Sequence, residues 1–117
     1  MISANVYKKI LMKMSLSKSE LLILKKKLTE RNICYGPFVK DGKMCPTTTA
    51  LSIKSKKVRF EKNRDVSKNL KKLGINKLYL WLFYITFDLP AMISRKFFKN
   101  RLRDLREVAD NLVQNSK

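Results

Sequence analysis

The most apolar stretch of the chain reads Leu78-Tyr79-Leu80-Trp81-Leu82-Phe83-Tyr84-Ile85-Thr86-Phe87. Its ten residues are about half of the roughly 20 that a membrane-spanning helix needs, so it is either a core helix or an element at a membrane surface. We expect the central helix of the fold over 77–87, with Trp81 in the core because aromatic residues surround it. The residue before Pro90 is disfavoured in a helix, so the helix should end near Asp88.

Apolar residues also recur at helical spacing on both sides of this stretch. This pattern predicts helices over 5–14, 18–31, 64–73 and 90–114. Ser17 and Glu20 have the spacing of a capping box at the start of the second of these helices. Gly74 is typical of a residue that ends a helix, and Asn76 is typical of one that caps the next.

Residues 34–49 interrupt the helical pattern, because the turn formers Gly36-Pro37, Asp41-Gly42 and Pro46 cluster there. Asp41-Gly42 lies between two short segments and predicts a small hairpin. Pro46 suits the first turn of a helix, which favours a short helix over 47–53. The sequence therefore predicts a mainly α fold: a compact single-domain bundle of about five helices, with a hairpin-like excursion near 34–49.

Composition excludes several kinds of site. The 117 residues contain no His, which removes histidine ligands and histidine-based catalytic dyads. Two cysteines are too few for a disulfide framework or for a four-ligand zinc site. We therefore predict no metal, no cofactor and no enzymatic activity. Lys8, Lys9 and Lys13 interrupt any signal-like apolar run, so we expect a cytoplasmic protein with reduced thiols and no transmembrane segment.

One short motif suggests a reactive thiol. Met44-Cys45-Pro46-Thr47 resembles the peroxidatic loop of peroxiredoxins over four residues, although Gly42 stands where that family has Thr. The resemblance implies a Cys45 thiolate at a helix N-terminus, where the helix dipole and Lys43 would lower its pKa. A buried structural cysteine at a turn is the interpretation we favour.

A second motif concerns DNA. Residues 66–75 resemble the first helix and turn of a helix-turn-helix motif, although Leu70 occupies a position that is usually small. The helix that follows is apolar and lacks the polar side chains that reach base edges, so we favour a core helix over a groove-reading one.

The charge is the strongest functional signal, because 27 Lys and Arg face only 9 Asp and Glu, a net charge of +18. Affinity for nucleic acids comes largely from such cations. We predict sequence-tolerant, non-enzymatic binding of DNA or RNA. The alternative is a regulatory or adaptor protein that binds an acidic protein. The predicted contact residues are Lys54, Lys56, Lys57, Arg59, Lys62, Arg64, Lys68, Lys71 and Lys72, and a secondary cluster comprises Arg95, Lys96, Lys99 and Arg101.

Overall fold

Seven α-helices, a π-helical turn and a two-stranded hairpin make up the computed structural model, which describes residues 2–35, 38–40, 42–55 and 63–115. The bounds are α1 Ile2–Met14, α2 Lys18–Lys27, β1 Val39–Lys40, β2 Lys43–Met44, α3 Pro46–Lys54, α4 Asn63–Lys72, α5 Lys77–Phe83, the π-helical turn η1 Tyr84–Asp88, α6 Leu89–Ile93 and α7 Arg95–Gln114. The predicted mainly α fold is confirmed.

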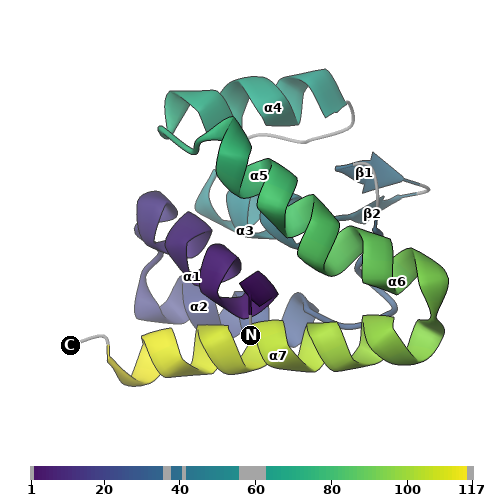
Figure 1. Ribbon diagram of the computed structural model, residues 1–117. Helices are drawn as coiled ribbons and strands as arrows, with labels where there is room; N and C mark the ends of the chain where they lie inside the picture. Colours follow the sequence, from purple (N-terminus) through teal and green to yellow (C-terminus); the bar gives the residue numbers. More distant parts are fainter. Residues whose placement is uncertain (1, 36–37, 41, 56–62, 116–117) are drawn as a thin grey trace.

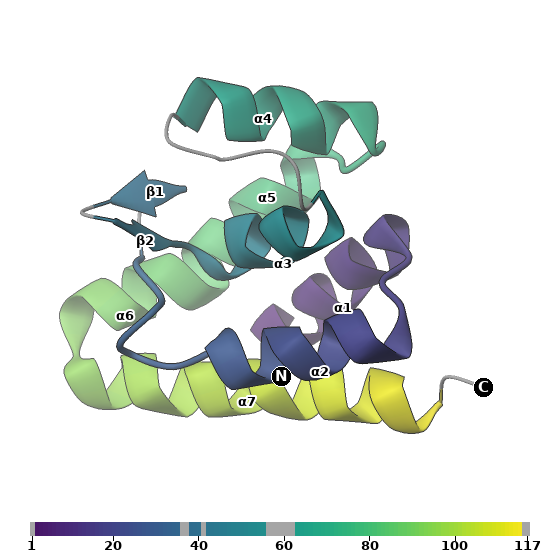
Figure 2. The ribbon, with the colours of Figure 1, turned by 180° about the vertical axis from the view of Figure 1, so that it is seen from behind.

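The long helix α7 supports the bundle. α1 and α2 pack against it, α5, η1 and α6 cross the molecule above it, and α4 lies at the opposite side (Figure 1). Seen from behind, α2, α3 and the hairpin lie toward the viewer (Figure 2). The core between these elements holds Tyr7, Ile10, Leu24, Phe87, Leu102 and Leu105.

The predicted local signals act as expected. Ser17 and Glu20 form both halves of the capping box that starts α2. Gly74 has a φ of 75°, and the Ile75 amide donates to the Leu70 carbonyl, so α4 ends in a Schellman motif. The side chain of Asn76 accepts from the amide of Leu78.

The hairpin is also confirmed. Val39 pairs with Met44, and Lys40 with Lys43, in antiparallel register. α3 follows with Pro46 in its first turn.

Several helix boundaries differ from the prediction. α2 ends at Lys27 and not at 31, and the Arg106 guanidinium takes the carbonyl of Leu28 at 2.7 Å. This side-chain donor replaces the amide that a longer helix would have supplied. Residues 29–33 form a turn instead, in which the Ile33 amide donates to the Thr29 carbonyl.

The central helix does not end near Asp88 but continues through Pro90 to Ile93. The Leu89 amide donates to the Tyr84 carbonyl five residues back, which is the bond of a π turn. This wider turn comes directly before Pro90, where a regular helix would meet the clash of the proline ring. The helix is interrupted at Ser94, whose backbone is extended, so the last helix begins at Arg95 and not directly after Pro90.

Candidate polyanion-binding surface

The outward face of α4 is basic. Val66 and Leu70 are buried beneath the helix, while the side chains of Arg64, Lys68, Lys71 and Lys72 are exposed. We call these four cations the α4 basic face. Arg64, Lys68 and Lys72 recur every four residues and Lys71 lies three residues after Lys68, on the side away from the buried stripe, which is the division that an amphipathic surface helix produces.

Four other predicted contact residues, Lys56, Lys57, Arg59 and Lys62, lie outside the described residues. Lys54 is exposed at the end of α3, where its ammonium group donates to the Ser15 carbonyl at 3.3 Å. The described part of the predicted site is therefore Lys54 together with the α4 basic face.

The α4 basic face is not neutralised within the part of the chain that the structure describes. Each ion pair found there joins residues of α2, α7 or the turn after α2, and none involves an α4 cation. Lys71 and Lys77 line one hollow of about 540 Å³ between α4 and α5. Lys77 thus extends the α4 basic face. Sequence reasoning missed it because it treated Lys77 only as the start of the apolar stretch.

The secondary cluster on α7 is largely paired. Arg95 and Lys99 lie 3.3 and 3.8 Å from the two carboxylate oxygens of Glu30. Arg101 lies 3.8 Å from the carboxylate of Asp104. Lys96 is exposed. These carboxylates compensate part of the charge that a phosphate would otherwise meet.

The far end of α7 contacts α2 through charged groups. The Lys25 ammonium group donates to the Asp110 carboxylate at 3.0 Å. The Arg106 guanidinium, on α7, also donates to the Leu28 carbonyl. Lys25 and Arg106 together therefore fix α2 on α7. Pairing within α7 between Arg106 and Asp110 would be the simpler expectation from their spacing, and packing replaces it with contacts between helices.

The helix after the α4 turn is not wholly buried. Phe83, Phe87 and Ala91 are buried, whereas Trp81 is 59% exposed and Leu78 is 53% exposed. The prediction that Trp81 lies in the core is wrong. Aromatic neighbours in the sequence point around a helix in all directions, so only one side of the stretch faces the bundle.

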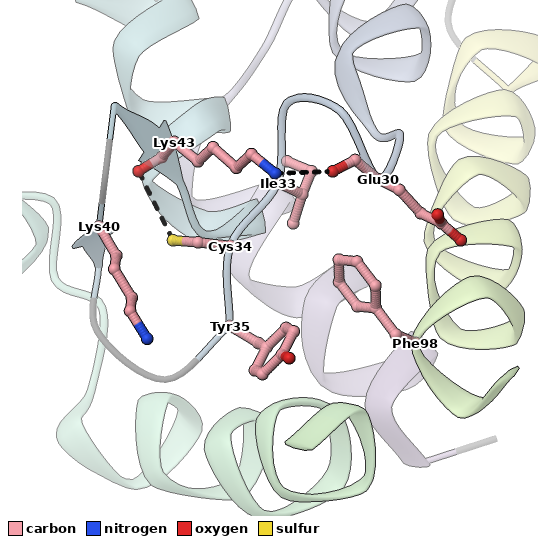
Figure 3. A pocket seen from close by; sticks show the side chains of 7 residues that line it. All are labelled: Glu30, Ile33, Cys34, Tyr35, Lys40, Lys43 and Phe98. Carbon is pink, nitrogen blue, oxygen red and sulfur yellow. Dashed lines mark hydrogen bonds between the residues drawn. The ribbon is translucent and has the colours of Figure 1, made fainter. Parts of the chain in front are cut away.

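A second hollow, of about 210 Å³, lies between the hairpin, the turn after α2 and α7 (Figure 3). The thiol of Cys34 donates to the Lys43 carbonyl at 3.5 Å, and the Lys43 ammonium group donates to the Glu30 carbonyl at 3.4 Å. Burial raises the pKa of the Cys34 thiol, and the charge of Asp88 raises it further. The thiol is therefore held in its protonated, weakly nucleophilic form.

Cys45 is a buried cap and not an activated thiolate. Its sulfur accepts from the amide of Thr48 at 3.4 Å at the start of α3. Burial nevertheless raises the pKa of the Cys45 thiol to about 12, which outweighs the opposing hydrogen bonds from Thr48. This is opposite in direction to the lowered pKa that the peroxiredoxin resemblance implies.

Among the described residues, no three His, Cys, Asp or Glu side chains come together in a group that could hold a metal ion. Within the same residues, no helix combines the length and apolar character needed to cross a membrane. No protein-family model, curated protein or solved structure matches this chain.

Proposed function

We propose that this protein binds nucleic acids without sequence preference and without catalysis, through the α4 basic face and the lysine-rich stretch before it. The observation that carries the proposal is the difference between the two basic helices. The α4 cations are exposed and form no ion pair among the described residues, while the α7 cations lie opposite Glu30 and Asp104.

Geometry supports contact with a phosphate backbone. Arg64 and Lys72 are eight residues apart on one helix, a distance of about 12 Å at 1.5 Å per residue. Duplex DNA presents about one negative charge per 1.7 Å of its axis, so several phosphates lie within reach of this face. Each cation that replaces a condensed counterion adds to affinity for any sequence.

Sequence tolerance follows from the adjoining helix. A groove-reading helix presents side chains that hydrogen-bond to base edges. The exposed side chains of α5 include Leu78, which has no hydrogen-bonding group, and Trp81, whose indole N–H is a single donor and cannot make the bidentate contacts that distinguish base pairs.

A salt titration of affinity tests the proposal. Lys68→Gln, Lys71→Gln and Lys72→Gln together remove three charges and keep long, helix-compatible side chains. The plot of log K against log salt has a negative slope, and its magnitude should decrease by up to about 2.7 on duplex DNA, since each phosphate contact contributes about 0.9. Fluorescence anisotropy on unrelated DNA and RNA sequences measures this slope.

The matched control is Arg95→Gln, Lys96→Gln and Lys99→Gln, which removes the same number of charges from α7. Its slope should change by less than about 1 if Glu30 already compensates Arg95 and Lys99. A larger change in the control would move the contact to α7. No binding by the unaltered protein at ~50 mM salt would overturn the proposal, because phosphate-driven affinity is strongest there.

A further inference from the structure

An uncovered apolar stripe runs along the helix formed by α5, η1 and α6. Trp81 is 59% exposed, Met92 54% and Ile93 79%. Single exposed apolar residues scattered over a surface are ordinary, but several along one helix form a patch that calls for an explanation. We call this surface the outer stripe; its residues are Leu78, Trp81, Tyr84, Leu89, Met92 and Ile93. In Figure 1, no other element passes in front of this helix.

The π turn lies between the two halves of the outer stripe. Leu78, Trp81 and Tyr84 recur every three residues, and Leu89 follows Tyr84 after five. The Leu89 amide donates to the Tyr84 carbonyl, so the five-residue step completes one widened turn of helix. Buried Phe83, Phe87 and Ala91 hold the opposite side against the bundle.

The surroundings of the outer stripe are positively charged. Residues 66–100 contain seven Lys and Arg and one carboxylate, that of Asp88, which is buried. Glu30, from the turn after α2, pairs with two of the seven, Arg95 and Lys99, and leaves an excess of cations. Lys77 precedes the stripe and Lys96 follows it, and both are exposed. An occupant that covers the stripe therefore meets cations at both ends, which complements a negatively charged partner.

Charge also excludes a second copy of this chain as the favoured occupant. Two molecules of net charge +18 would bring like charges together around a shared apolar contact. A helix received in a groove is likewise a poor match. The hollows at the two ends of the stripe are lined by Lys77 and Leu80 and by Met92 and Ile93, and Trp81 lines neither of them.

We propose that the outer stripe inserts into the interface of a membrane that carries anionic lipids. Trp and Tyr favour the headgroup level, Leu, Met and Ile reach the start of the acyl region, and Lys side chains meet anionic headgroups. The stripe spans 16 residues, about 23 Å of helix, which would lie parallel to the membrane plane. This surface adjoins the α4 basic face at Lys77, but the proposal does not rest on nucleic-acid binding.

The sequence supplies its own probe, because Trp81 is its single tryptophan. The protein should float with vesicles of phosphatidylcholine and phosphatidylglycerol. On binding, the emission of Trp81 should shift to shorter wavelength and be quenched by brominated acyl chains. Vesicles of phosphatidylcholine alone should bind at least tenfold more weakly.

A matched pair of variants separates insertion from plain attraction between charges. Leu78→Gln, Met92→Gln and Ile93→Gln together should weaken partition into anionic vesicles at least tenfold. Met12→Gln, Leu22→Gln and Ile23→Gln alter three exposed apolar residues on α1 and α2 and should leave partition within twofold. Circular dichroism of both variants serves as the control that they keep their helices.

Three results would overturn the proposal. The first is flotation without a shift in Trp81 emission, which charge alone would produce. The second is equal loss of partition in both variants. The third is an emission shift with an acidic amphipathic peptide but none with anionic vesicles, which would assign the stripe to a protein partner.

Discussion

The two faces of the helix that comprises α5, η1 and α6 carry similar side chains in opposite environments. On the inner face, the ring of Phe83 stacks on Tyr7 at 5.4 Å and on Phe87 at 5.1 Å between centroids. On the outer face, Trp81 is more than half exposed. Apolar composition therefore does not determine burial; the neighbouring helices α1 and α7 do, and they cover only one face.

The inner face should give the largest effect. Phe87→Ala removes a fully buried ring that stacks on Phe83 and meets Phe98 edge-on at 6.1 Å. We expect the free energy of unfolding to fall by about 3–5 kcal/mol, the range for a buried Phe→Ala change. Urea unfolding followed by far-UV circular dichroism measures it. A loss below about 1.5 kcal/mol would mean that the inner face is not packed as described.

The hydroxyl behind the inner face should give an intermediate effect. Tyr7 is fully buried, and its hydroxyl donates to the Pro46 carbonyl at 2.9 Å. Tyr7→Phe leaves that carbonyl without this donor and should cost about 1–3 kcal/mol at pH 7. Tyr84→Phe, on the exposed outer face, is the matched control and should change the free energy of unfolding by less than about 0.5 kcal/mol.

The effect of Tyr7→Phe on the free energy of unfolding should depend on pH in a defined direction. Burial raises the pKa of Tyr7 well above 10, so the folded protein keeps a proton that the unfolded chain begins to lose near pH 10. The contribution of Tyr7 is therefore complete below pH 10 and declines as pH rises further. The stability difference between the wild type and Tyr7→Phe should narrow above pH 10. A gap that widened there would contradict the buried, protonated phenol.

Local signals in the sequence predicted the fold well where a side chain acts on its own backbone. Ser17 with Glu20, Gly74 and Asn76 set helix ends through contacts within five residues. The wrong boundaries depend on distant contacts or on a change of helix type. Arg106 reaches Leu28 across the bundle, and the π turn after Phe83 carries the helix past Pro90.

The candidate surface was predicted as composition and not as arrangement. The excess of cations in 54–72 was evident from the sequence, as was the stripe of Val66 and Leu70 that turns the α4 basic face outward. Glu30 lies 65 residues before Arg95, so no local pattern could indicate their ion pair. The exposure of Trp81 could not be predicted for the same reason, since it depends on which side of the helix α1 and α7 occupy.

The outer face should give the smallest effect on stability. Trp81→Ala removes a ring that is 59% exposed, so the change gives up little of the stabilisation that a fully buried Trp provides. Ala is also the stronger helix former. We expect a loss of less than about 1 kcal/mol in urea unfolding, compared with about 3–5 kcal/mol for Phe87→Ala. If Trp81→Ala cost as much as Phe87→Ala, the ring would belong to the core and the outer stripe would be misplaced. A small loss of stability combined with loss of vesicle binding would instead separate the two faces by role: the inner face holds the bundle together, and the outer face meets the lipid.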